Sequence, residues 1–128
     1  ACGEGVYRSV DRGEHWEKIT PPGPRTFGSS VMEDSNGTLY LGVALGRPNT
    51  WLRKERANAA LYASHDGGKS WQIAVEGSRG GIMAMCPNVN GDGVFASTSE
   101  GDVLDVNTTG SRTIISRLPS ITALALGA

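Results

Sequence analysis

The chain has 128 residues, of which 12 are Lys or Arg and 13 are Asp or Glu, so its formal charge is -1. Glycine is abundant, with 18 residues, while 38 % of the residues are hydrophobic and 20 % are charged. This composition excludes a disordered chain, and the absence of a Gly-X-Y period excludes a collagen. The longest uncharged apolar run, residues 121–128, is far too short to span a membrane. The near-neutral charge argues against a dedicated nucleic-acid binder.

A hairpin motif occurs twice, at an offset of 55 residues. In each copy an aromatic residue is followed by Ser, Asp, Gly and Trp, at intervals of two, four, six and nine positions. Asp can accept hydrogen bonds from backbone N–H groups of its own turn and glycine supplies a positive φ, so the pattern predicts a tight hairpin whose Trp covers the turn. A third, degenerate copy keeps only its glycine, Gly110. The complete copies are Ser9, Asp11, Gly13 and Trp16, and Ser64, Asp66, Gly68 and Trp71.

Strands are predicted on both sides of each hairpin, and Asn-Gly turns are expected to join further strands between them. Two strands flank the first hairpin, at 6–9 and from Trp16, and two more flank the second. The other predicted strands are 26–33, 38–42, 81–86, 94–97, 103–106, 112–115 and 121–126, which brings the total to eleven.

The doubled motif resembles the Asp-box, also called the bacterial neuraminidase (BNR) repeat. This repeat is found in β-propellers, including sialidases and other glycosidases, sortilin-type receptors and photosystem II assembly factors. The resemblance implies that each box is a structural clasp between the third and fourth strands of a blade, away from the ligand face. It therefore implies structural rather than catalytic roles for the Ser, Asp, Gly and Trp of both copies.

The eleven strands predict a single all-β unit over 1–128, a β-propeller segment of about three four-stranded blades. Its blade pieces lie at about 1–20, 26–76, 81–116 and 121–128. Closed propellers have four to eight blades, so three blades leave sheet faces uncovered. We expect either that the chain is part of a larger propeller or that copies of it assemble into a homo-oligomeric ring.

The connection that precedes the second hairpin, about 44–58, is some ten residues longer than its counterpart at 98–102. It carries four basic residues against one acidic residue, and Thr50 is predicted to cap a short helix over 51–59. In a propeller this connection lies on the rim opposite the clasps, where ligands usually bind. The first candidates for a contact surface are therefore Arg47, Trp51, Arg53 and Arg56.

Arginines also recur in the connections between successive blades, at Arg25, Arg79 and Arg117. On the same rim they could converge, and their guanidinium groups would suit carboxylate, sulfate or phosphate groups. Arg25 and Arg79 are therefore the second candidates for ligand contact. The simpler interpretation, that these are solvated loop residues, stays open.

The sequence favours a non-catalytic binding or scaffold module whose rim binds a protein or an anionic or glycan ligand. The alternative is a sector of a sialidase-like or other glycoside hydrolase propeller, which would need paired carboxylates beside a cleft. No catalytic residue is assigned, because the acidic residues of the expected rim have no spacing that indicates a pair. Those residues are Glu55, Glu76, Glu100 and Asp102.

Other features predict no metal site, cofactor or membrane span. The segment 88–93 resembles half of a calcium loop, but Ser99 stands where the bidentate Glu belongs, so a plain turn is expected. His15 is expected to be a surface residue. Cys2 and Cys86 could be buried free thiols or a disulfide. The compartment is not determined, with an extracellular or periplasmic location slightly favoured.

Overall fold

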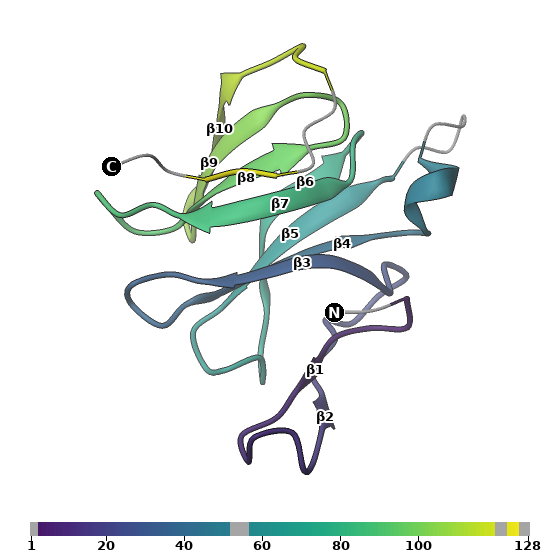
Figure 1. Ribbon diagram of the computed structural model, residues 1–128, viewed down its shortest axis with the longest axis vertical. Coiled ribbons are helices and arrows are strands. Elements are labelled where there is room, and N and C mark those ends of the chain that lie inside the picture. Colours follow the sequence, from purple (N-terminus) through teal and green to yellow (C-terminus); the bar gives the residue numbers. More distant parts are fainter. Residues whose placement is uncertain (1–2, 52–56, 120–122, 126–128) are drawn as a thin grey trace.

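The computed structural model describes residues 3–51, 57–119 and 123–125, and there the fold is all-β (Figure 1). Three antiparallel sheets form a partial propeller-like segment: a β1-β2 pair and two four-stranded sheets, β3-β4-β5-β6 and β7-β8-β9-β10. The described residues contain no helix with the length and hydropathy needed to cross a membrane. The strands are β1 (Tyr7–Arg8), β2 (Glu17–Lys18), β3 (Phe27–Glu33), β4 (Leu39–Ala44), β5 (Ala59–Ser64), β6 (Gln72–Ser78), β7 (Ile82–Pro87), β8 (Val94–Thr98), β9 (Val103–Asn107) and β10 (Gly110–Ile115).

Each four-stranded sheet is a meander in which every strand pairs with the next one along the chain. The first strands of the two sheets, β3 and β7, pack beside each other (Figure 1). The last strands, β6 and β10, are the outer ones, and β10 is largely exposed. The two clasp motifs lie in the turns β1–β2 and β5–β6, so they occupy equivalent places in successive sheets.

The central strands of the middle sheet, β4 and β5, are buried on both faces, and all six residues of β5 are buried, whereas β3 and β6 are partly exposed. Alternate side chains of a strand point to opposite faces. One face of β4 and β5, including Tyr40 and Leu61, packs toward the third sheet, and the other, including Leu41 and Tyr62, packs toward the first hairpin. The sheet is therefore enclosed by its neighbours on both sides, as blades are in a propeller.

The long connection differs from the predicted helix. Its described residues contain the 3-10 turn η1 (Pro48–Thr50), and Ala59 is already the first residue of β5, while 52–56 lie outside the described residues. Thr50 is the last residue of this turn, and its Oγ1 donates to the carbonyl oxygen of Arg47 at 2.7 Å. The small, buried residues that read as helix formers at the end of this segment instead fill the core between two sheets.

The remaining elements follow the predicted pattern with shifts of a few residues at their ends. Ten strands are found in the described residues. The predicted last strand, 121–126, lies mostly outside them, and its described residues 123–125 are not in a strand. Cys86 is a buried free thiol whose pKa is raised by burial, while Cys2 lies outside the described residues.

Candidate functional site

The first clasp hairpin, Ser9–Trp16, is closed by its own side chains. Ser9 Oγ donates to Asp11 Oδ1 at 2.8 Å and accepts from the backbone N–H of Gly13 at 2.7 Å. Asp11 Oδ1 also accepts from the backbone N–H of His15 at 2.9 Å. The Trp16 indole N–H donates to the carbonyl of Gly13 at 3.0 Å, so its ring stays over its own turn.

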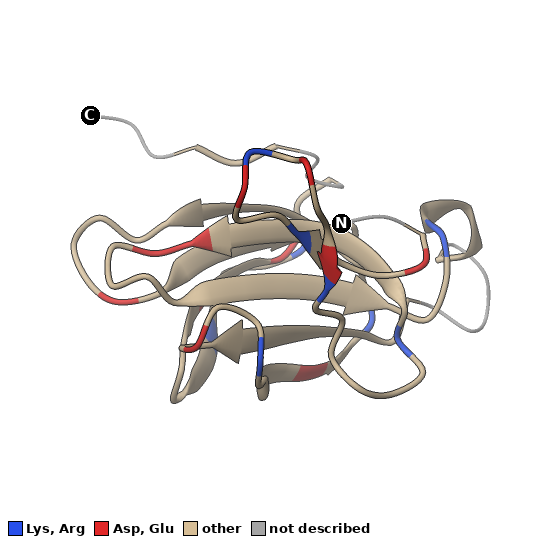
Figure 2. Ribbon diagram, turned by 90° about the horizontal axis from the view of Figure 1, so that it is seen from below, with Lys and Arg blue, Asp and Glu red and all other residues tan. Residues whose placement is uncertain are grey.

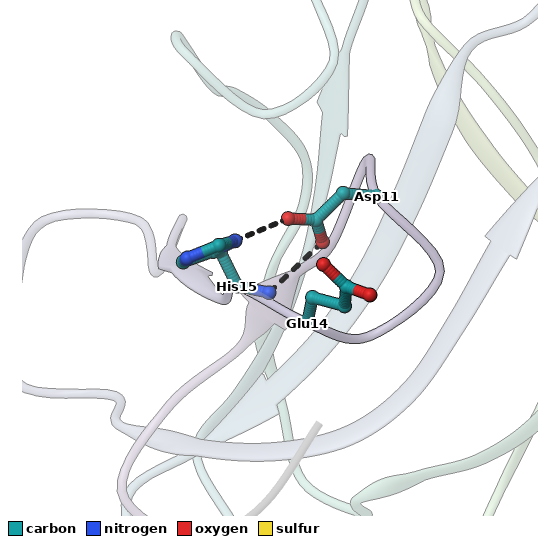
Figure 3. A group of neighbouring side chains, drawn as sticks. All are labelled: Asp11, Glu14 and His15. Atoms are coloured by element: carbon teal, nitrogen blue, oxygen red, sulfur yellow. Dashed lines mark hydrogen bonds and ion pairs between the residues drawn. The ribbon is translucent and has the colours of Figure 1, made fainter.

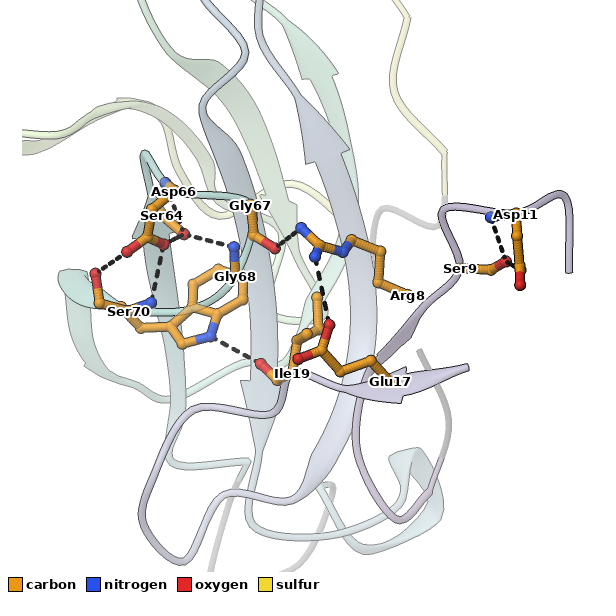
Figure 4. A network of polar contacts seen from close by, with 11 residues as sticks. Arg8, Ser9, Asp11, Glu17, Ile19, Ser64, Asp66, Gly67, Gly68 and Ser70 are labelled. Carbon is orange, nitrogen blue, oxygen red and sulfur yellow. Dashed lines mark hydrogen bonds and ion pairs between the residues drawn. The ribbon is translucent and has the colours of Figure 1, made fainter. Parts of the chain in front are cut away.

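The second clasp hairpin, Ser64–Trp71, repeats these bonds (Figure 4). Ser64 Oγ donates to Asp66 Oδ1 at 2.8 Å and accepts from Gly68 N at 2.8 Å. Asp66 Oδ1 accepts from the backbone N–H of Ser70 at 2.9 Å, and Asp66 Oδ2 from its hydroxyl at 2.5 Å. Here the Trp71 indole N–H donates at 2.8 Å to the carbonyl of Ile19, which belongs to the preceding hairpin.

A hydrogen-bonded arginine also connects the two hairpins. Arg8, on β1, donates to the carbonyl of Gly67 in the second turn and pairs with Glu17 at 3.4 Å (Figure 4). No role was predicted for Arg8 from the sequence, and the matching position in the second copy is Ala63. Together with the Trp71–Ile19 bond, this contact joins successive sheets on the clasp side.

Both clasp carboxylates are held in the ionised form. Hydrogen bonds from the Ser70 hydroxyl, the Ser70 backbone and Ser64 lower the pKa of Asp66 far below its ordinary value. The backbone N–H of His15, and then Ser9, likewise lower the pKa of Asp11. A general acid needs a raised pKa, so these groups are suited to hold turns rather than to transfer protons.

The group Asp11, Glu14 and His15 has the side chains of a metal site, with ligand atoms within 4.8 Å of one another (Figure 3). His15 Nδ1, however, lies 2.5 Å from Asp11 Oδ2. It occupies the place that the Ser70 hydroxyl takes in the second hairpin. His15 is therefore part of the clasp, and not only the surface residue that the sequence analysis expected.

The degenerate third copy keeps a turn of a different kind. Asn107 Oδ1 accepts from the backbone N–H groups of Thr109 at 2.9 Å and Gly110 at 3.1 Å, and from the Thr109 hydroxyl at 2.6 Å. An Asn that binds the backbone two residues ahead forms an Asx turn. Asn107 was not identified from the sequence, because only the positions aligned with the Ser, Asp and Trp of the complete copies were compared. Asn107 lies one residue away from the aligned positions.

The first turns of the two four-stranded sheets are joined through Asp34, which is 7 % exposed. Its Oδ1 accepts from the backbone N–H groups of Asn36 at 2.9 Å and Thr38 at 3.0 Å, and its Oδ2 accepts from Gly93 N at 3.1 Å. Burial, and then the charge of Asp34, raise the pKa of Tyr40 to about 12. The calcium-like segment 88–93 is thus a turn, and its Gly93 N–H donates a structural hydrogen bond to the neighbouring turn.

Trp51 lies in the core and not on the expected contact surface. Its side chain is 4 % exposed, its indole N–H donates to the carbonyl of Gly46 at 2.8 Å, and its ring meets Phe27 edge-on at 6.0 Å between centroids. Because Trp51 is buried, it is not available to contact a ligand. Arg47 remains exposed beside it, and Arg53 and Arg56 lie outside the described residues.

Arg25 also has a structural position. Its guanidinium donates to the carbonyl of Asn58 at 2.7 Å and pairs with Glu76 at 2.5 Å, and its side chain is 12 % exposed. These contacts fix the segment that leads into β5. They also engage Glu76, one of the acidic residues expected on the rim.

Two of the three expected arginines do converge. Arg79 and Arg117 line a cavity of about 400 Å³ between β6 and the β9–β10 hairpin, together with Glu100 and Asp102. We call this space the rim cavity. All four residues come from the connections opposite the clasps, as their places in the strand order predict. From the sequence, the arginines and the acidic residues were considered separately, and their convergence on one cavity was not predicted.

Comparisons with known proteins identify similar enzymes but no family. No family model matches the chain, and no solved structure matches it. A xyloglucanase of Paenibacillus sp is 30 % identical over 155 aligned positions, which cover 94 % of this chain and 14 % of that enzyme. Xyloglucanase Xgh74A of Acetivibrio thermocellus is 29 % identical over 105 positions, covering 64 % of this chain and 11 % of the enzyme. The chain is thus similar to a short stretch of these glycoside hydrolases, and it spans about one seventh of the length of the first.

Proposed function

We propose that this chain is a sector of a β-propeller glycoside hydrolase that acts on xyloglucan, and that its two clasp hairpins are Asp-boxes. The observation that carries the proposal is the similarity to a xyloglucanase over 94 % of the chain, across all three sheets. This favours the alternative from the sequence analysis over a non-catalytic binding module.

The clasp geometry supports a structural role for the Asp-boxes in such an enzyme. The same three bonds close both turns: Ser donates to Asp, the Gly N–H donates to Ser, and the backbone N–H four residues after the Asp donates to its carboxylate. The second hairpin is also bonded to the first through Ile19. Bonds of this kind hold successive blades at a fixed spacing. The clasp side therefore serves as framework and leaves the opposite rim for the polysaccharide.

The carboxylates available on that rim are few. Hydrolysis of a glycosidic bond generally uses two carboxyl groups, one on each side of the bond. Glu76 is held by Arg25, and Glu55 lies outside the described residues. Glu100 and Asp102 are the two of the four rim candidates that line a cavity. We propose that this sector supplies framework and substrate contacts.

The experiment is a hydrolysis assay on the protein in the form in which its source organism produces it. We expect reducing ends to be released from xyloglucan, faster than from unbranched cellulose or from starch, because the relatives are xyloglucanases. Heat-inactivated protein is the control. Binding of xyloglucan without hydrolysis would instead support the non-catalytic module, and release of sialic acid from a sialoside would support the sialidase-like alternative.

A further inference from the structure

The rim cavity is built by loops that are fixed to one another. Ser99 N donates to the carbonyl of Gly81 at 2.9 Å, and Gly81 N donates to Ser99 Oγ at 3.0 Å. These bonds join the segment that carries Arg79 to the one that carries Glu100. The backbone positions from which these two side chains extend are therefore fixed relative to each other.

The third loop is attached in the same way. Leu118 N donates to the carbonyl of Gly101 at 3.1 Å, which holds Arg117 beside the turn that bears Glu100 and Asp102. Gly101 has a φ of +86°, and a Cβ there would overlap the Leu118 backbone. Arg117 itself has a φ of +63°, a conformation that non-glycine residues adopt at a cost. Glycine at 101 thus permits the close approach that completes the cavity.

Among the described residues, the four charged side chains of the cavity have no polar partner in the protein. Arg8, Arg25 and Arg112 each pair with a carboxylate. Within the described residues, by contrast, these four charged side chains form no ion pair and no hydrogen bond. Among the other lining residues, the Ser78 hydroxyl donates to the carbonyl of Gly80 at 2.9 Å. Two guanidinium groups and two carboxylates therefore face one space with their donors and acceptors free. These side chains belong to Arg79, Glu100, Asp102 and Arg117.

This set of groups matches a neutral polyhydroxylated ligand better than an ion. The formal charges of the four side chains cancel, so an anion or a cation gains little from the site as a whole. Elsewhere too, basic and acidic residues are interspersed, mostly at turns and strand ends (Figure 2). A sugar hydroxyl both donates and accepts, so it can donate to a carboxylate while accepting from a guanidinium.

The remaining lining fits the same ligand. Ser111 and Thr113 add hydroxyl groups from β10, while Val75 and Leu104 supply apolar surface for the C–H face of a sugar ring. A cavity of about 400 Å³ lies in the range of roughly 300–1,000 Å³ typical of small-ligand sites.

We infer that the rim cavity is a subsite that binds one neutral sugar unit of the polysaccharide through Arg79, Glu100, Asp102 and Arg117. The identity of the sugar rests on the proposed function, because it is taken from the substrate of the similar enzymes. The existence of the site rests on the cavity and its unengaged charges.

The test compares four single variants of the protein as its source makes it: Arg79→Ala, Arg117→Ala, Glu100→Gln and Asp102→Asn. A xyloglucan-derived oligosaccharide is titrated by calorimetry, and KM and kcat for xyloglucan are measured on the same preparations. A hydrogen bond to a charged group typically contributes about a factor of ten or more to affinity. We expect each variant to raise Kd and KM about tenfold or more, with a smaller change in kcat.

Arg12→Ala is the matched control, because Arg12 is an exposed arginine of the first clasp hairpin, on the side opposite the rim cavity, and does not line that cavity. It should leave Kd and KM unchanged. Thermal unfolding midpoints of all five variants should match the parent, because none of these side chains forms a hydrogen bond or an ion pair within the part of the chain that the structure describes. A variant that unfolds is replaced by Arg79→Lys or Arg117→Lys, which keeps the charge and loses the planar fork.

The outcomes separate the two proposals. If xyloglucan is hydrolysed but the four variants bind and turn it over like the parent, the subsite is overturned and the proposed function stands. If no polysaccharide is hydrolysed yet the oligosaccharide binds and the variants weaken that binding, the subsite stands without the enzyme. Tighter binding of glucuronate or a free amino acid than of the neutral oligosaccharide overturns the neutral-sugar assignment.

Discussion

The two clasp hairpins have the same internal bonds and different surroundings. In both, a Ser hydroxyl joins an Asp carboxylate to a glycine N–H with distances that agree within 0.1 Å. Yet the Trp16 side chain is 64 % exposed, whereas Trp71 packs against the cluster that contains Ile19 and Tyr62. Each turn is therefore closed by residues close in sequence, whereas the burial of its Trp depends on the neighbouring sheet.

The contrast between Trp16 and Trp71 predicts the largest effect. Replacing a well-packed Trp with Ala typically costs about 3–5 kcal/mol. Because Trp71 is only partly buried, we expect Trp71→Ala to lower the free energy of unfolding by about 3 kcal/mol, and Trp16→Ala by about 0.5 kcal/mol. Urea unfolding of the two variants measures the difference. Equal losses would contradict the idea that the neighbouring sheet decides the contribution of the Trp.

The two clasp glycines also differ in the space around them. Gly13 and Gly68 have φ values of +94° and +90°, so Ala is strained at either. A Cβ at Gly68 would also lie 2.7 Å from Ile19 Cδ1, whereas at Gly13 the nearest atom, in the Trp16 ring, is 3.8 Å away. We expect Gly68→Ala to destabilise the chain by about 2 kcal/mol more than Gly13→Ala. Thermal unfolding tests this, and a larger loss at Gly13 would contradict it.

The clasp carboxylates predict a dependence on pH. The pKa of Asp66 is lowered in the folded chain, so its stabilising contribution is present above the unfolded pKa, near 3.8, and is lost as the pH falls toward the folded value. Asp66→Asn should therefore be less stable than the parent at neutral pH, and the gap should narrow below about pH 4. The same sign holds for Asp11.

Unfolding midpoints of Asp66→Asn and Asp11→Asn across this pH range measure the effect. The pKa of Asp66 is lowered further than that of Asp11, so we expect the wider stability gap at neutral pH for Asp66→Asn. A gap that grows in acid would show that the carboxylates are not held ionised by the clasp.

The smallest effect is expected where the two hairpins differ in sequence but not in geometry. His15 and Ser70 both place a side-chain group 2.5 Å from the second oxygen of the clasp Asp. His15→Ser should therefore change the free energy of unfolding by no more than about 0.5 kcal/mol. His15→Ala, which keeps the backbone bond but removes the side-chain partner, is the matched control and should destabilise more. A large loss in the Ser variant would point to a separate role for His15.

Much of the fold could be predicted from local patterns. Asn-Gly turns, period-two alternation and the repeat at 55 residues placed the strands within a few residues, because these signals act between close neighbours. The helix over 51–59 was wrong in its described part. Its small apolar residues suit a helix or a buried strand equally, and packing between two sheets decided for the strand.

The candidate site was predicted only in part. The opposite rim and the convergence of Arg79 and Arg117 follow from strand order, which the sequence could supply. Trp51 and Arg25 were placed on the same rim for the same reason, yet one fills the core and the other pairs with Glu76. Whether a rim side chain turns inward depends on gaps between sheets, which no local pattern encodes.

The amino-acid sequence by itself determined the all-β character, the two clasp turns and their equivalence, because each depends on residues within one hairpin. Only the tertiary structure shows that Trp71 is partly buried while Trp16 is exposed, and that four charged side chains with no ion-pair partner among the described residues surround one cavity. The physical reason is that burial and charge pairing are set by contacts between sheets, made by residues far apart in the chain.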